Sequence, residues 1–272
     1  MNRYAIESCV LRWRFGSALA VLALATASSA QSSCPSTYRH TWSPRDASPG
    51  SIGFGNYLTI NAAGDRFAAS SSYVHQGLET GAVWVVTGHG APTQHVTKLL
   101  PSILTNNMAF GSAVAMDGTG NVLVVGAGGV GPVHIFVYAY DGASWNEHPI
   151  VVAGTPGDWL GASAAISRDG SVFAVGAPHR LEGWNVTSGA IEVFRRQAGA
   201  WAHEATLTPV QTGFNHRIGH GIAMSGDGRF VAGRAFVSSN SPVPNGAVYV
   251  FEHVAGNWVQ AAKLQEPVAY SN

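Results

Sequence analysis

Charged residues are scarce in this sequence. Asp, Glu, Lys and Arg make up 11% of its 272 residues, against about 25% in a typical soluble domain. The 15 basic and 15 acidic residues cancel to a formal net charge of zero, so the chain has no electrostatic footprint for nucleic acid or an anionic membrane. Glycine is instead abundant, at 33 residues, and 46% of the chain is apolar. Together with many Val, Ile and aromatic residues, this favours an all-β protein with many tight turns.

A run long and apolar enough to cross a membrane is also missing. The apolar run at residues 18–25 is much shorter than the roughly 20 residues that span a bilayer. Three arginines precede it, and the small residues Ser28–Ala30 follow it, which is the pattern of a cleaved signal peptide. We therefore predict that residues 1–30 are a signal peptide. The mature protein is expected to be secreted, periplasmic or at the cell surface, without a transmembrane anchor.

Cysteine is also scarce in this sequence. The chain has two, and Cys9 lies within the predicted leader. The remaining Cys34 cannot form an internal disulfide, so the exported chain must be stabilised by packing. Cys34 follows the leader closely, and lipid attachment there stays open as an alternative. Gln31, however, stands where a lipid-attachment motif has an aliphatic residue.

What the sequence does contain is an internal repeat. An apolar residue followed by glycine recurs four times, and each time a second glycine comes ten residues after the apolar one. The four sets are Phe54-Gly55 with Gly64, Phe110-Gly111 with Gly120, Leu160-Gly161 with Gly170, and Ile218-Gly219 with Gly228. The apolar-glycine markers are 56, 50 and 58 residues apart, so each unit has fifty-odd residues.

Each unit predicts four strands. A small apolar run follows the marker, as at 112–116, and a nearly continuous apolar run follows the turn glycine, as at 122–127 and 172–177. Such continuous runs are typical of strands buried on both faces. The fourth strand of a unit carries polar residues that suit an outer edge, and it begins at Trp145, Trp201 or Trp258.

The third strand of each unit, such as 189–194, is expected to be half-buried, because polar residues alternate with aliphatic ones. Glu192 and Tyr249 are the alternating residues. Three phenylalanines are expected at one register of these strands, where they would form the core between neighbouring units: Phe136, Phe194 and Phe251.

Four-stranded units of this length, buried near the axis and more polar outward, are typical of β-propeller blades. The predicted fold class is therefore an all-β β-propeller built of four-stranded antiparallel blades. An N-terminal segment at 31–48 contains a possible closing strand. The blades are predicted at about 49–101, 102–153, 154–209 and 210–266.

The stretches FGSAVAMDGTGNVLVVGA (110–127) and LGASAAISRDGSVFAVGAP (160–178), with SGAIEVF (188–194), resemble the FG-GAP repeat. This repeat is the blade unit of integrin α-chain propellers and of many exported bacterial proteins. The resemblance covers roughly residues 49–266 and implies a propeller that binds partners through the loops of one face. Family propellers usually have seven blades. We therefore expect an incomplete propeller, either truncated or completed by another copy through its open blade edges.

The resemblance also raises the question of calcium, because many FG-GAP blades bind it in the turn between the first two strands. Calcium takes six to eight oxygen ligands, whereas the four turns offer one aspartate each: Asp65, Asp117, Asp169 and Asp227. A single aspartate beside glycine is expected to form the turn itself. We predict no metal or other cofactor.

Motifs for catalysis are missing as well. The sequence has no HExxH, G-x-S-x-G or Walker motif and no paired-cysteine site, so no enzymatic activity is predicted. His216 and His220 have a spacing that suits zinc on a helix. They flank Ile218 at the start of a predicted strand, however, where structural or solvent-facing roles are expected. The acidic residues Asp158, Glu192 and Glu204 lie in different elements, without spacing for acid–base chemistry.

The most conspicuous candidate binding site is the loop 178–188 of the third unit, with eleven residues against three at 128–130 in the second. Long loops on a rigid scaffold often carry function. Tryptophan with arginine in such loops resembles a binding hot spot; the alternative is a loop folded on itself with tryptophans as local anchors. The candidate ligand-binding residues, from this loop and the adjoining segments 154–160 and 212–218, are His179, Arg180, Glu182, Trp184, Trp159, Phe214 and Arg217.

The sequence thus predicts an exported propeller scaffold for non-enzymatic binding or adhesion to a protein or glycan. Two alternatives stay open. One is an accessory or catalytic propeller of a polysaccharide-degrading enzyme, as in some polysaccharide lyases; the other is a purely structural surface repeat. A cluster of Tyr, His, Arg or carboxylate side chains at the mouth of one face would favour the enzyme, and no such cluster is visible in the sequence.

Overall fold

The structure is a computed structural model of a chain that divides into two units, Met1–Ser43 and Pro44–Asn272. All described residues belong to the second unit. They are residues 54–71, 80–88, 94–103, 107–129, 134–148, 155, 157–182, 186–210, 216–236 and 246–265. The predicted signal peptide, Cys34 and the possible closing strand within 31–48 lie outside these ranges.

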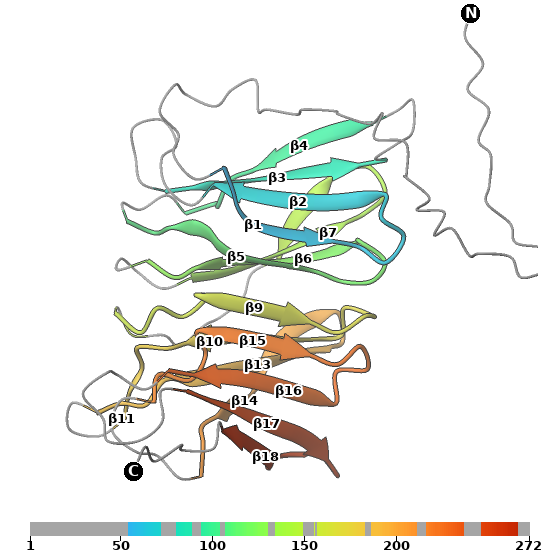
Figure 1. The fold of residues 1–272 in the computed structure, drawn as a ribbon. Helices are drawn as coiled ribbons and strands as arrows, with labels where there is room; N and C mark the ends of the chain where they lie inside the picture. Colours follow the sequence, from blue (N-terminus) through green and yellow to red (C-terminus); the bar gives the residue numbers. More distant parts are fainter. Residues whose placement is uncertain are drawn as a thin grey trace, which may run out of the picture. The chain divides into compact units, whose positions relative to one another are not determined.

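Four antiparallel four-stranded sheets make up the described part of the chain, and each is a simple meander. They follow one another in chain order from the blue β1 to the red β18 (Figure 1). Sheet 1 contains β1 (Phe54–Ile60), β2 (Arg66–Ser71), β3 (Ala82–Thr87) and β4 (His95–Leu99). Sheet 2 contains β5 (Phe110–Met116), β6 (Val122–Ala127), β7 (His134–Tyr140) and β8 (Trp145–His148).

Sheet 3 contains β9 (Ser163–Ile166), β10 (Val172–Ala177), β13 (Ala190–Gln197) and β14 (Ala200–Leu207). A small hairpin, β11 (Leu181–Glu182) with β12 (Val186–Thr187), lies between its second and third strands. Sheet 4 contains β15 (Gly221–Met224), β16 (Phe230–Ala235), β17 (Ala247–Val254) and β18 (Asn257–Gln265). Four-stranded meanders of this kind, packed face to face, define a β-propeller, and the predicted fold class is confirmed.

The second strands form where the continuous apolar runs predicted them. Every residue of β6 and β10 is buried, because each of these strands lies inside its sheet and between neighbouring sheets. The first strand of the chain differs: β1 exposes Leu58 and Ile60. Burial of the first strand therefore holds for β5 but not for β1.

In sheets 2, 3 and 4 the turn between the first and second strands is closed by aspartate, as expected. In sheet 1 the side-chain oxygen of Asn61 accepts from the N–H of Arg66 instead, and Asp65 accepts from the Asn61 side chain. Asp117 accepts hydrogen bonds from the backbone N–H groups of Thr119 and Val122. Asp169 and Asp227 likewise accept backbone hydrogen bonds two residues ahead, from Ser171 and Arg229. These carboxylates serve the local turn geometry that Asx-type turns require.

Neighbouring sheets pack through the first strand of the following sheet. β5 lies against β1 and β2, β9 against β5 and β6, and β15 against β9 and β10. Three apolar cores fill the junctions between consecutive sheets. Phe136, Phe194 and Phe251 are buried in these three cores in turn, so their predicted role in the core is confirmed.

The prediction that these three phenylalanines share one register of the third strands is wrong. Phe194 and Phe251 pair with the second residue of β10 and of β16, whereas Phe136 pairs with the fourth residue of β6. The position equivalent to Phe136 in sheet 3 is Glu192, and in sheet 4 it is Tyr249. Neither faces solvent, since Glu192 is 3% and Tyr249 0% exposed. In β13 the residues at 190–194 are therefore all buried rather than half-buried, because both faces of sheet 3 lie against neighbouring sheets. In β17 buried residues alternate with partly exposed ones, so the predicted half-burial holds there.

Glycines permit the closest contacts between sheets. A Cβ on Gly176 would lie 1.9 Å from the carbonyl oxygen of Gly219, and a Cβ on Gly126 would lie 2.0 Å from that of Gly161. The repeated glycines of the second strand and of the marker are thus backbone-to-backbone contact points.

A second set of contacts joins the turns. The N–H of Ala62 donates to the C=O of Gly118, the N–H of Gly118 to the C=O of Arg168, and the N–H of Arg168 to the C=O of Gly226. All four residues lie eight positions after their markers. These turn-to-turn hydrogen bonds run through all four sheets and fix their mutual stagger.

Candidate functional site

The long loop of sheet 3 has a fixed base. The N–H of Arg180 donates to Ala177 at the end of β10, and the N–H of Gly189 donates to Arg180 across the loop. Gly189 also forms a parallel bridge with Ile218, the marker of sheet 4. The loop is therefore closed at its base by hydrogen bonds of its own, and its end is joined to sheet 4 at Gly189 and Ile218. It carries the hairpin β11–β12.

A row of aromatic rings crosses this base. Trp159 stacks on His179 with ring centroids 4.0 Å apart and an interplanar angle of 26°. His179 meets His220 edge to face, with centroids 5.9 Å apart. Trp159 precedes β9, His179 follows β10, and His220 precedes β15. We call these three residues, with Arg217, the loop-face cluster.

Arginines surround the histidines of this cluster. Burial, aided by the charge of Arg217, lowers the pKa of His179 below its ordinary value. Burial also lowers the pKa of His220, and the charges of His179, Arg217 and Arg234 lower it further. Both rings are consequently neutral at physiological pH, and each can accept a hydrogen bond or a proton through one ring nitrogen.

Neither Arg217 nor Arg234 forms an ion pair with any other described residue. The Nε of Arg217 is buried and finds no hydrogen-bond partner within the described ranges. Buried polar atoms are ordinarily satisfied, so an unpaired guanidinium nitrogen is a place where a ligand oxygen would be stabilised. The cluster thus offers flat rings and positive charge that no described carboxylate neutralises.

The backbone of the cluster is unusual. Trp159 has φ 55° and Arg217 has φ 45°, in the left-handed region that side chains other than glycine, asparagine and aspartate seldom adopt. Both residues directly precede a marker, and Ala109, at the same position of sheet 2, has φ 53°. The conformation therefore belongs to the repeat. A bulky side chain there costs about 1–2 kcal/mol, and glycine would avoid this cost.

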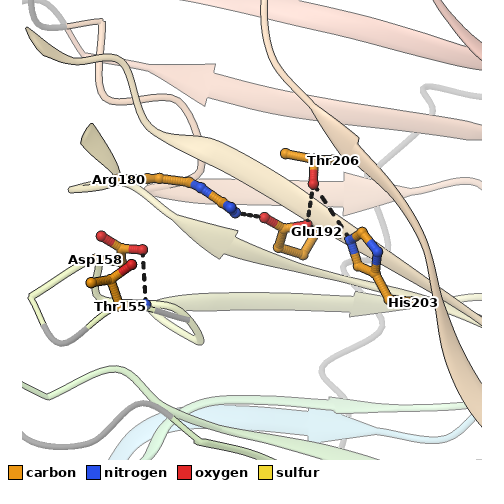
Figure 2. Close-up of polar contacts among 6 residues, drawn as sticks. All are labelled: Thr155, Asp158, Arg180, Glu192, His203 and Thr206. Carbon is orange, nitrogen blue, oxygen red and sulfur yellow. Dashed lines mark hydrogen bonds and ion pairs between the residues drawn. The ribbon is translucent and has the colours of Figure 1, made fainter. Parts of the chain in front are cut away.

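A second polar group lies on the face of sheet 3 that meets sheet 2. Figure 2 shows Arg180, His203 and Thr206 converging on the carboxylate of Glu192. His203 Nε2 lies 2.6 Å from Glu192 Oε2, and Thr206 donates to the same oxygen at 2.7 Å. Arg180 forms an ion pair with the other oxygen. The nearby Asp158 is occupied separately, by the backbone N–H of Thr155.

The position of Glu192 sets sheet 3 apart. The equivalent residues of the other sheets are the aromatic side chains Trp84, Phe136 and Tyr249. A buried carboxylate must be paired and hydrogen-bonded, and Arg180, His203 and Thr206 meet that need. Because Arg180 stands at the base of the long loop, the ion pair fastens the loop to the sheet.

The structure describes four of the seven candidate side chains. It brings Trp159 and His179 into contact and places Arg217 beside them, while Arg180 is engaged by Glu192. Trp184, Phe214 and the side chain of Glu182 lie outside the described residues. Sequence reasoning missed His220, because two histidines flanking a marker carry no sign that one of them faces a loop of the preceding sheet.

The described residues contain no group of three or more His, Cys, Asp or Glu side chains that could hold a metal ion. No helix among them has the length and apolar character needed to cross a membrane.

No protein-family model matches the sequence, and no curated protein matches it. Solved structures do resemble the chain. A provisionally assigned 6-phosphogluconolactonase from Bacteroides uniformis has a TM-score of 0.48 at 12% identity, over 79% of this chain and 72% of that protein. TolB from Acinetobacter baumannii has a TM-score of 0.44 at 13% identity, over 79% of this chain and 44% of TolB.

A complex of KlAtg21 with the coiled-coil of AgAtg16 has a TM-score of 0.50 at 11% identity, over 79% of this chain and 58% of that chain. This chain therefore spans less than half the length of TolB and under two thirds of the chain in that complex. At these identities the likeness concerns the fold alone. The assignment as a β-propeller rests on the four sheets and their junctions.

Proposed function

We propose that the protein is an exported β-propeller scaffold that binds a negatively charged glycan, without chemical conversion, through the loop-face cluster. Trp159, His179 and His220 supply flat ring surfaces, and Arg217 supplies an unpaired cation. Arginine binds carboxylate and sulfate groups well, because its donors match their geometry. A protein ligand is the other outcome that the test can return.

One observation carries the proposal: bulky side chains occupy left-handed backbone positions at Trp159 and Arg217. Stability alone would favour glycine at such positions. Sparsely populated conformations persist where function requires the side chain. That both side chains lie in one cluster supports a binding role for it.

Export is proposed from the leader pattern at residues 1–30, and kinship with FG-GAP repeats from the motifs in the two best-preserved units. The spacing of the markers supports this kinship, since the apolar-glycine pairs recur at the junctions between sheets. A purely structural repeat would have no reason to place aromatic and cationic side chains at the strained positions.

The test is a glycan array with uronate-bearing, sulfated and neutral oligosaccharides. We expect signals on acidic glycans for the wild-type chain and their loss in Trp159→Gly, which removes the ring while relaxing the backbone. Ala109→Gly is the matched control, because it makes the same backbone change in sheet 2. Binding that survives in Trp159→Gly, or an array without acidic hits, would refute the proposal. Unfolding of Trp159→Gly would assign the ring to packing instead.

A second candidate is an enzyme that cleaves a uronate-containing polysaccharide by elimination. It is favoured by the positions of His179 and His220, whose ring centroids lie 5.9 Å apart beside Arg217, because a neutral imidazole next to a cation can accept a proton. The base would take the proton next to the sugar carboxylate, and a double bond would form to the adjacent carbon. That carbon's bond to the leaving oxygen would break, and the leaving oxygen would take up a proton from water. Ultraviolet absorbance of the unsaturated product separates this candidate from simple binding.

A further inference from the structure

The face of sheet 4 that points away from sheet 3 has the residue pattern of a buried face. Sheet 3 buries five apolar residues against sheet 4: Val172, Ala174, Ile191, Val193 and Leu207. The strand registers place apolar residues at the same five positions of sheet 4: Phe230, Ala232, Val248, Val250 and Leu264. Phe230 is nevertheless 36% exposed and Leu264 59% exposed. A contiguous apolar face of this kind marks an interaction surface.

The first strand of sheet 1 has the complementary property. Its Leu58 and Ile60 are 68% and 61% exposed. The residues at the same two positions of the other sheets pack into the core of the preceding junction: Val114 and Met116 in sheet 2, Ala164 and Ile166 in sheet 3, and Ile222 and Met224 in sheet 4. Each junction is thus made by a first strand, and β1 alone among the four first strands has its two apolar side chains exposed.

The row of turn-to-turn hydrogen bonds ends with one unpaired backbone group on sheet 1 and one on sheet 4, among the residues that the structure describes. Gly226 accepts from Arg168, but its own N–H has no acceptor among the residues that the structure describes. At the opposite end, Ala62 donates to Gly118, and its C=O receives no described hydrogen bond. The unmatched donor and the unmatched acceptor occupy the same position of the repeat, so one can bind the other.

Arg234 is the one departure from the pattern of sheet 3, where Gly176 takes its place. A Cβ at this position does not by itself prevent packing. Sheet 1 has Ser70 there, and Gly111 of sheet 2 still packs against its Cβ. The guanidinium of Arg234 lies 5.6 Å from the centroid of the ring of Phe236, two residues further along the chain.

We propose that this face of sheet 4 binds β1 of a second copy of the chain, with the N–H of Gly226 donating to the C=O of Ala62 in the other copy. The occupant is a second copy because the exposed Leu58 and Ile60 of β1, with the C=O of Ala62, match the apolar residues and the N–H of Gly226 on this face. Two such contacts, one from each copy to the other, would close an assembly of eight sheets. Eight blades lie within the range of about 4–8 in propellers, and two-fold assemblies are the commonest oligomers.

The test measures the molar mass of the full chain, expressed for export, by size-exclusion chromatography with light scattering. We expect a dimer for the wild-type chain. Leu58→Asp on sheet 1 and Phe230→Asp on sheet 4 should each raise the dissociation constant at least tenfold. Val210→Asp changes a residue that is 80% exposed outside both faces, and it should leave the dimer intact.

Mixing the two variants distinguishes this arrangement from others. In a mixed dimer both aspartates fall at one junction and the other junction is native, so equimolar mixing should restore dimers. A wild-type monomer at all concentrations would overturn the proposal. A dimer that tolerates Leu58→Asp would also overturn it, because sheet 4 would then be meeting something other than sheet 1.

Discussion

Substitution of Gly176 by alanine tests how closely sheets 3 and 4 approach. The new Cβ would lie 1.9 Å from the carbonyl oxygen of Gly219 and 2.5 Å from Ser163 Oγ. Real Cβ contacts essentially never fall under 3.0 Å, so the Gly219 backbone must retreat by about 1.1 Å, the difference between 3.0 and 1.9 Å. Such a shift would also disturb the bond from Ser163 Oγ to the same carbonyl.

Overpacking usually costs about 1–3 kcal/mol. We expect about 3 kcal/mol here, because the obstacle is backbone on an adjacent sheet rather than the end of a flexible side chain. For a chain of this length that is a fall in melting temperature of roughly 6–12 °C. Differential scanning calorimetry and urea denaturation of the purified chain would measure it.

Gly221→Ala is the matched control. Gly221 also lies in a strand, but the nearest atom to its new Cβ is Arg234 Cβ at 3.9 Å. We expect its stability to be unchanged or raised by up to about 1 kcal/mol, since alanine loses less backbone entropy on folding. Equal stability of Gly176→Ala and wild type would refute the close contact between the marker glycine and the second strand.

Three further predictions concern metal, pH and the buried carboxylate. Millimolar calcium should leave the melting temperature unchanged, whereas a ligand at a hundred times its dissociation constant would add about 2.7 kcal/mol; a rise that a chelator reverses would show that the turn aspartates bind the ion. Burial lowers the pKa of His179, His216 and His220 below 6.5, so the unfolded chain takes up protons first and stability should fall as pH decreases below 6.5. The difference in melting temperature between the wild type and His220→Gln should be constant above that pH and change below it. Glu192→Ala should lower the free energy of unfolding by about 1–3 kcal/mol, less than the loss of a fully buried pair, because the Arg180 side chain is 34% exposed. Glu192→Phe, which places the aromatic residue of sheet 2 at this position, should lower it less. Equal losses for the two variants in urea denaturation would contradict the equivalence of the two positions.

The repeat made the fold predictable. Strands β6 and β10 occupy the apolar runs predicted at 122–127 and 172–177, because glycine turns and two-faced burial leave a strong local signal. The register of the third strands was harder. Phe136 was predicted at the register of Phe194, but in sheet 2 it occupies the position that Glu192 has in sheet 3. The connection before β7 is much shorter than the one before β13, so counting from the preceding glycine misplaced it.

The candidate site was predictable only in part. The length of the loop at 178–188 pointed to the right corner of sheet 3, and Trp159 and His179 do meet there. The engagement of Arg180 by Glu192 and the contact of His220 with His179 could not be foreseen. The first contact depends on how the strands of one sheet pair, and the second on how two sheets are staggered. The spacing of residues in the sequence predicts neither.

The measurement that tests the central claim most directly is calorimetric titration with the acidic glycan that gives the strongest array signal. The dissociation constants of the wild-type chain, Trp159→Gly and Ala109→Gly would be compared at a temperature at which all three proteins are folded. The account predicts that Trp159→Gly weakens binding about 30-fold, the equivalent of about 2 kcal/mol at a hot spot, while Ala109→Gly binds like wild type. Equal affinity of all three proteins would contradict a binding site at the loop-face cluster.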